Sequence, residues 1–176
     1  RTYPVTAASH EYPGLFQDYV ASIVARWQMS EEESFLQLER DLSHLGLTSQ
    51  VRARQRSDTE VEILVGRLLS DRSSQGTDFV SIADVGFGLS QSLPVVVALL
   101  ESSRGELLYI EQPEMHLHPR AQVARADLIV RCANRGVQVV IETHSELLLI
   151  AVQKLVALGE IASDTTGLHW FTRDEK

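Results

Sequence analysis

Two short apolar runs in the sequence each end in a cluster of polar side chains. Leu107 to Ile110 is followed by Glu111-Gln112-Pro113-Glu114, and Val139 to Ile141 is followed by Glu142-Thr143-His144-Ser145. In open parallel sheets, ligands bind beyond the carboxyl ends of the strands. A carboxylate held there could bind a hydrated Mg²⁺ ion, and a histidine there could hydrogen-bond a terminal phosphate. These two strand ends are therefore the first candidates for chemistry.

A third candidate is the glycine-containing segment Asp84 to Gln91 (DVGFGLSQ). We expect it to lead into a helix from about Gln91 to Ser102, with Pro94 in the first turn. The free N–H groups and the positive dipole end of such a helix attract anions. The segment therefore predicts an anion-binding position.

The elements that must position these residues alternate between strand and helix in the second half of the chain. We expect strands at 79–82, 107–110, 137–141 and 168–172, and helices at 91–102, 119–134 and 146–158. Nearly continuous apolar strands separated by helices are typical of a parallel sheet buried on both faces. The fold class predicted is therefore α/β. A polar stretch from Ser70 to Thr77 predicts a loop before this region.

The first half of the chain predicts a helical hairpin. Apolar residues recur at three- and four-residue steps over 15–29 and again over 35–45. Ser30 and Glu33 have the spacing of a capping box at the start of the second helix, and Gly46 is suited to its end. We expect two antiparallel helices that pack through their apolar faces.

A β-hairpin is predicted between Val51 and Val65, because the pattern there changes to period two. With a loop at 57–59, Arg56 would lie opposite Glu60 and Arg54 opposite Glu62. A nucleic-acid backbone could also contact these arginines, but a salt-paired strand face explains them with fewer assumptions.

Composition excludes several classes of protein. The 176 residues are 44% hydrophobic and 23% charged, which argues against disorder and fibrous structure. The net charge of −8 disfavours a nucleic-acid-coating module. The apolar runs are too short to span a bilayer, so no membrane partner is expected. Cys132 is the only cysteine, which fits a reducing compartment, and we expect the protein to be cytoplasmic.

In their order along the chain, the segments 84–91, 107–119 and 139–145 resemble the signature motif, the Walker B strand with its D-loop, and the switch-histidine loop of ABC-type ATPases. More narrowly, they resemble the stand-alone group that includes RecF, the SMC proteins and the OLD family, in a subgroup with an EQPE-x-HLHP segment. The resemblance is good over 84–158 and loose over the first 80 residues. It implies a partial P-loop NTPase fold, an ABC-type lobe.

The resemblance also implies roles for individual residues, with ATP and Mg²⁺ as ligands. Glu111 takes the Walker B position that holds Mg²⁺, and His144 takes the switch position that contacts the γ-phosphate. The signature position falls on four residues and completes the nucleotide site of the opposite copy in a homodimer, and the D-loop crosses that interface. The signature residues are Gly86, Gly88, Ser90 and Gln91, and the D-loop runs from His116 to His118.

The sequence departs from the family pattern in two places. The position after the Walker B acid is normally a glutamate that polarises the attacking water, and here it is Gln112. Either Glu114 substitutes for that glutamate, or water is only positioned, or turnover is slow. The sequence also has no G-x-x-x-x-G-K-[ST] loop. With its start at Arg1, this predicts a carboxyl-proximal fragment whose partner is an N-terminal P-loop lobe.

The predicted organisation has two parts and leaves the process open. Residues 1–80 hold the helical hairpin and β-hairpin, and 81–176 hold the C-terminal part of the ATPase domain. Relatives of this kind serve DNA repair or defence against phage, with DNA or a nuclease effector as a further partner. One alternative is a catalytically inactive dimerisation module, which Gln112 supports. Another is a zinc site built from the set Glu114, His116, His118, Cys132 and His144.

Overall fold

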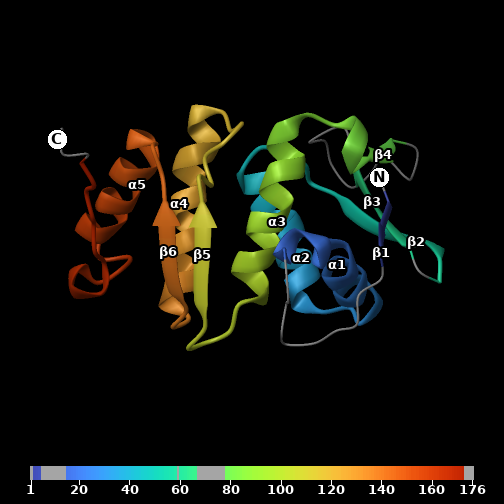
Figure 1. Cartoon of the computed structure of the whole chain (residues 1–176), viewed down its shortest axis with the longest axis horizontal. Coiled ribbons are helices and arrows are strands. Elements are labelled where there is room, and N and C mark those ends of the chain that lie inside the picture. The colour runs from blue at the N-terminus through green and yellow to red at the C-terminus, as the bar shows by residue number, and fades with distance from the viewer. Residues whose placement is uncertain (1, 5–14, 59, 67–77, 173–176) are drawn as a thin grey trace.

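The computed structural model describes residues 2–4, 15–58, 60–66 and 78–172, which form two sheets and five α-helices with their connections. Figure 1 shows the elements side by side, from β1–β4 with α1 and α2 at one end to β5, β6 and α5 at the other. The antiparallel strands are β1 (Thr2–Pro4), β2 (Val51–Ser57), β3 (Glu60–Gly66) and β4 (Phe79–Ser81), and the parallel strands are β5 (Leu107–Glu111) and β6 (Gln138–Glu142). The helices are α1 (Val20–Met29), α2 (Glu33–His44), α3 (Phe87–Glu101), α4 (Pro119–Asn134) and α5 (Glu146–Ala157), with short 3₁₀ turns at Phe16–Asp18, Ile82–Asp84 and Ser163–Thr165.

The helical hairpin is confirmed, although its starts differ from those predicted. A 3₁₀ turn at Phe16–Asp18 precedes α1, so the α-helix begins at Val20 rather than Leu15. The residue at the N-cap of α2 is Glu32, and no side chain caps it, so the capping box at Ser30 is wrong. Gly46 follows α2 with φ of +71°, the left-handed conformation expected of a residue after a helix end.

The β-hairpin is also confirmed, with a local shift in register. Arg54 lies opposite Glu62 as predicted, but a bulge places Ser57 opposite Glu60, so Arg56 does not face Glu60. Arg56 instead donates from Nε to Glu62 at 2.7 Å, and Arg54 donates to the same carboxylate. These bonds from Arg56 and Arg54 lower the pKa of the buried Glu62 to about 2. Two of the arginines thus form a salt-paired strand face.

The segment at 79–82 joins a different sheet from the one predicted. β4 pairs antiparallel with β3, and β5 pairs only with β6 within the described part of the chain. The parallel sheet seen here therefore has two strands. The strand predicted at 168–172 is wrong as well, because those residues have no strand pairing. The loop predicted at 70–77 lies outside the described residues.

The parallel sheet is covered on one face only. Ile110 is buried and Leu108, Val139 and Ile141 are partly buried on the face toward the helices, and Figure 1 shows α4 behind the sheet. On the other face Leu107 is 65% exposed and Tyr109 is 57% exposed. The prediction of a sheet buried on both faces is wrong for the described residues. Exposed apolar side chains on this face are an unusual feature of parallel β-structure, because parallel sheets are normally covered on both faces.

A single apolar core joins the two halves of the chain. Trp27 of α1 and Leu38 of α2 pack in the same buried cluster as Val96 of α3 and Leu128 of α4. The predicted boundary at residues 80 and 81 falls inside β4. The mixed α/β architecture, with a parallel pair flanked by helices and an antiparallel hairpin sheet, confirms the predicted fold class and is consistent with a partial P-loop NTPase fold.

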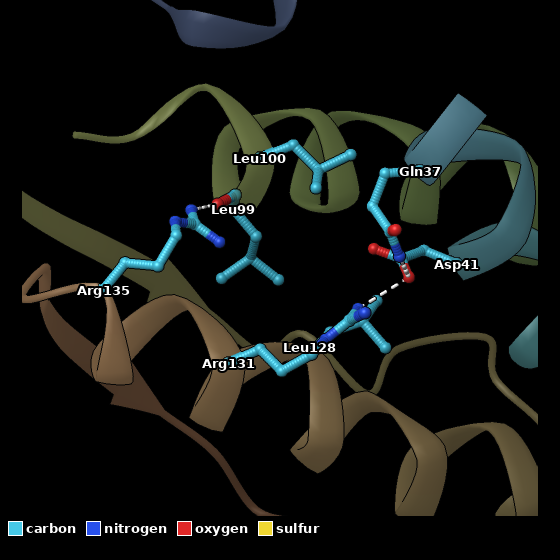
Figure 2. A pocket seen from close by; sticks show the side chains of 7 residues that line it. All are labelled: Gln37, Asp41, Leu99, Leu100, Leu128, Arg131 and Arg135. Carbon is cyan, nitrogen blue, oxygen red and sulfur yellow. Dashed lines mark hydrogen bonds and ion pairs between the residues drawn. The ribbon is translucent and has the colours of Figure 1, made fainter. Parts of the chain in front are cut away.

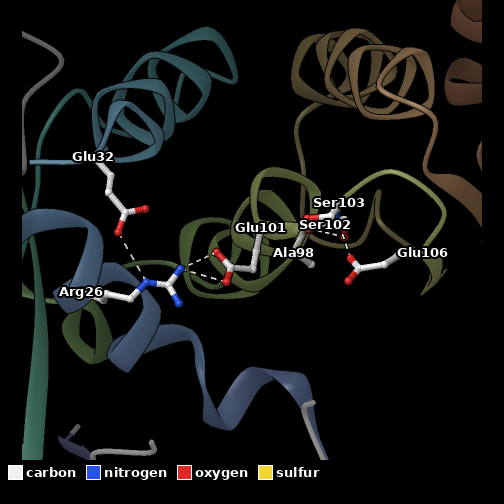
Figure 3. A network of polar contacts seen from close by, with 7 residues as sticks. All are labelled: Arg26, Glu32, Ala98, Glu101, Ser102, Ser103 and Glu106. Carbon is white, nitrogen blue, oxygen red and sulfur yellow. Dashed lines mark hydrogen bonds and ion pairs between the residues drawn. The ribbon is translucent and has the colours of Figure 1, made fainter. Parts of the chain in front are cut away.

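Ion pairs at the surface reinforce the packing of α1 on α3. Figure 3 shows Arg26 of α1 reaching Glu101 at the end of α3, with an N–O distance of 2.7 Å, and Glu32 at 3.5 Å. Further along, Glu106 accepts a hydrogen bond from the Ser103 N–H at 2.8 Å, which shapes the turn into β5. This network lies at the carboxyl end of α3, far along the helix from the candidate segment at its start.

Candidate functional site

The two polar strand ends predicted from the sequence lie next to each other. Glu111 is the register partner of Glu142, because β5 and β6 run parallel and end at the same edge. Tyr109 donates a hydrogen bond to the Glu142 carboxylate at 2.8 Å, and this bond raises the pKa of Tyr109. The edge therefore carries two exposed carboxylates side by side.

The chain turns sharply after Glu111. The Gln112 N–H donates to the Glu142 carbonyl at 2.7 Å, which extends the strand pairing by one step. Gln112 and His116 both have positive φ, at +44° and +59°. Such conformations are uncommon for residues with a side chain and cluster at functional sites. The turns within this loop lead directly into α4, where His118 is the N-cap and accepts from the Arg120 N–H through Nδ1 at 3.4 Å.

His144 is brought to the same edge by a hydrogen bond from the neighbouring loop. Its backbone N–H donates to Glu114 Oε1 at 2.9 Å, although 30 residues separate the two in sequence. The His144 side chain is exposed. Glu111, Glu114 and His144 therefore share one end of the parallel sheet, and their roles there stay predictions.

A second link between the two loops was missed in the sequence. Ser145 is the N-cap of α5 and donates from its hydroxyl to Gln122 Oε1 at 2.7 Å. Gln122 in turn donates to the Leu117 carbonyl at 3.0 Å. The position of Gln122 in the first turn of the helix that follows the Glu111 loop was the available signal, because such a side chain can reach back to adjacent loops.

The predicted signature segment contacts the same loop. α3 begins at Phe87, with Gly86 as the N-cap, so the helix starts four residues earlier than predicted. Gly88, Ser90 and Gln91 therefore lie in its first turns, and Pro94 lies in the helix interior rather than in the first turn. A Cβ atom on Gly88 would lie 2.9 Å from the His116 carbonyl oxygen. The Phe87 and His116 rings are 5.5 Å apart.

The amino end of α3 thus packs closely on the loop that follows β5. Ser90 Oγ donates to the Phe87 carbonyl at 3.2 Å, and the next residue, Gln91, is exposed. Helix N–H groups and the helix dipole favour anions at such an end. The structure therefore brings the signature segment and the D-loop segment together, and the contact depends on glycine at position 88.

The donor atoms at the sheet edge are chemically suited to Mg²⁺. Glu111 and Glu142 offer carboxylate oxygens, the ligand type that this ion prefers, and Mg²⁺ needs only one or two of them. The arrangement of the residues does not fit the alternative of a zinc site. Over the described residues, no three His, Cys, Asp or Glu side chains are grouped so that they could hold a metal ion. Cys132 is buried in the core, where burial raises the pKa of its thiol.

A separate cavity of about 290 Å³ lies between α2, α3 and α4. Figure 2 shows its lining: Gln37, Asp41, Leu99, Leu100, Leu128, Arg131 and Arg135. Arg131 donates to Asp41 Oδ1 at 2.6 Å, and Arg135 donates to the Leu99 carbonyl. The lining residues of α3 and α4 belong to the carboxyl-terminal halves of those helices, whereas the candidate site lies at their amino ends. The charged groups here pair with the protein itself, so the lining gives no sign of a ligand site.

Comparison with known families decides the coarse functional class. Residues 15–151 match the family model described as "AAA domain, putative AbiEii toxin, Type IV TA system". The chain belongs to this AAA domain family. No protein with a curated description matches it. The AAA domain is an ATPase-type, nucleotide-binding module, which agrees with the class predicted from the motifs.

In the described part of the chain no helix is both long enough and apolar enough to cross a membrane.

The match to the AAA domain family spans both halves of the chain. It begins at Leu15, before α1, and ends within α5, so it includes the helical hairpin, strands β2 to β4 of the antiparallel sheet and the parallel pair. Glu111, His144 and the segment Gly86 to Gln91 all lie inside the matched range. The narrower assignment to the RecF, SMC and OLD group stays a prediction.

Proposed function

We propose that this chain is the carboxyl-proximal part of an ABC-type AAA domain that binds and hydrolyses ATP between two copies of the domain. The observation that carries this proposal is that Glu111 and His144 lie at one sheet edge, Glu111 through its pairing with Glu142 and His144 through the Glu114 hydrogen bond. Ligands of open parallel sheets bind at this end of the strands. The AAA family match supports a nucleotide as that ligand.

Each of these residues would have its own role in binding ATP or in its hydrolysis. Glu111 would hold Mg²⁺ through water, and the exposed His144 imidazole would donate a hydrogen bond to the terminal phosphate. When bound, Mg²⁺ would neutralise charge on the phosphate oxygens. Gln112 cannot accept a proton, so it would orient the attacking water, and slow turnover is expected.

The amino end of α3 would bind the ATP held by the opposite copy. The segment from Gly86 to Gln91 presents helix N–H groups to an anion, and the exposed Phe87 lies against His116 of the D-loop segment. His116 and His118 would thus lie at the interface between the two copies, close to both nucleotides. This arrangement accounts for the packing of the two segments on each other.

An N-terminal P-loop lobe would complete the site. The phosphate cradle needs a Gly-rich loop and a lysine that this sequence does not contain. The open face of the parallel sheet offers the lobe a place to pack, because Leu107, Tyr109 and Val140 are exposed there. We propose that turnover serves DNA repair or phage defence through DNA or a nuclease effector. The family description, with its reference to a toxin, favours defence.

A catalytically inactive dimerisation module is the second candidate, and Gln112 favours it. Both candidates are tested by measuring Mg²⁺-dependent ATP binding and hydrolysis with the full-length protein and with the 176-residue chain. We expect binding and slow hydrolysis by the full-length protein and no appreciable hydrolysis by the chain alone. Binding without hydrolysis would support the inactive module. Robust turnover by the chain alone, abolished by Glu111→Ala, would show that the missing-lobe account is wrong.

A further inference from the structure

Two hydrogen bonds hold the chain at His144, one at its own backbone N–H and one at the side chain of the next residue, Ser145. Glu114 Oε1 accepts from the His144 N–H at 2.9 Å, and the Ser145 hydroxyl donates to Gln122 Oε1 at 2.7 Å. The Leu148 N–H also donates to Ser145 Oγ at 3.1 Å, which fixes the start of α5. The loop that carries the imidazole is therefore positioned by side chains from the preceding loop and from α4.

Glu114 is itself held in place by the turns around it. The Leu117 N–H donates to the Glu114 carbonyl at 3.1 Å, and the positive φ angles at Gln112 and His116 enclose this segment. The Glu114 residue is half-buried, and among the described residues Oε2 has no hydrogen-bond partner although it is fully shielded from solvent. A shielded carboxylate oxygen without a donor costs free energy. This cost is present in the folded structure, in which Oε1 accepts a hydrogen bond from the His144 backbone N–H.

We infer that Glu114 is a positioning residue for His144 and does not replace the missing general base. This inference rests on the proposed ATPase function for its catalytic consequence, but the contact that it describes is independent of ATP. One oxygen of Glu114 is occupied by the His144 N–H, and the other lies out of solvent. A side-chain oxygen used this way orients the loop, because its removal would leave the His144 N–H without its acceptor.

The structural arm of the test is hydrogen–deuterium exchange of the full-length protein, followed in peptides that cover residues 142–148. Glu114→Ala removes the acceptor, and Glu114→Asp keeps the charge but shortens the side chain by one methylene. We expect both to speed exchange at the His144 amide and the first turn of α5 about tenfold or more. Glu114→Gln keeps an acceptor oxygen at the same reach and should stay within about threefold of wild type.

Glu146→Gln is the matched control, because it removes one negative charge two residues from His144 without touching the Glu114 bond. It should leave exchange at 142–148 close to wild type. Exchange in the buried segment 121–132 of α4 reports whether each variant is folded. Should Glu114→Ala fail to fold, Glu114→Asp and Glu114→Gln still give opposite expected results.

The catalytic arm compares ATP turnover by the same variants. As a positioning residue, Glu114 predicts a turnover loss of about tenfold or more for Glu114→Ala and near-complete rescue by Glu114→Gln, with ATP affinity changed less than turnover. Unchanged exchange in both Glu114→Ala and Glu114→Asp would overturn the inference whether or not the protein hydrolyses ATP. Loss of turnover in Glu114→Gln as complete as in Glu114→Ala, with exchange unchanged, would show that Glu114 takes a proton. Absence of turnover in the wild type would count against the proposed function only.

Discussion

Glu111 and His144 are two residues whose neighbourhood follows from chain topology. Each comes just after an apolar run, and parallel strands that pair side by side bring their carboxyl ends to one edge. The approach of these two positions could therefore be predicted from the sequence. The bond between Glu114 and the His144 amide could not, because it depends on left-handed turns at Gln112 and His116 that no local pattern indicates.

Gln112 is the residue at which the proposed chemistry is weakest. Its side chain cannot accept a proton, so Gln112→Glu should raise ATP turnover by the full-length protein about tenfold or more, since a placed general base contributes roughly 10²–10⁴-fold. Steady-state hydrolysis measures this effect. Gln138→Glu makes the same change at the start of β6, at the opposite end of the strand, and should leave turnover as it was. Unchanged turnover in Gln112→Glu with ATP binding intact would show that the amide does not limit the reaction.

At the scale of elements, the spacing of apolar residues predicted the presence of the helices more accurately than the residues at which they begin. α1 and α3 begin five residues later and four residues earlier than expected, and the capping box at Ser30 is not formed. Sheet membership was harder still. The strand at 79–82 looked like part of the alternating pattern, yet β4 pairs with the hairpin, because strand partners are set by long-range packing rather than by local sequence.

The contact between α3 and the D-loop segment gives a prediction at the same scale. A side chain at Gly88 would meet the backbone oxygen of His116, so Gly88→Ser should destabilise the fold by about 1–3 kcal/mol. Helix propensity alone would favour serine over glycine and give the opposite sign. Thermal unfolding of the full-length protein should show a midpoint lower by roughly 2–12 °C.

Gly86→Ser is the matched control for that substitution. A Cβ there meets no atom within 4 Å, and serine is a preferred N-cap residue. The control should unfold at or slightly above the wild-type midpoint. A Gly88→Ser protein as stable as Gly86→Ser would mean that the two segments can separate without cost.

At the scale of the whole molecule, the sequence predicted the α/β class and its helical and hairpin parts, but it also predicted a sheet covered on both faces. The two apolar strands form as predicted, but Leu107 and Val140 are exposed to water in the described part of the chain. Apolar character indicates that a surface becomes buried, and it does not say which part of a protein buries it. The proposed P-loop lobe, packed on this face, would account for both the apolar pattern and its exposure.

The measurement that tests the central claim most directly is ATP turnover together with ATP affinity for Glu111→Ala and His144→Ala in the full-length protein. We predict that both variants lose about 100-fold or more in turnover, and that His144→Ala weakens ATP binding by far less, because its proposed contact is with the terminal phosphate. His169→Ala, at an exposed histidine near the carboxyl end, should behave like the wild type. Wild-type turnover in either site variant, or an equal loss of binding and turnover in His144→Ala, would contradict the account.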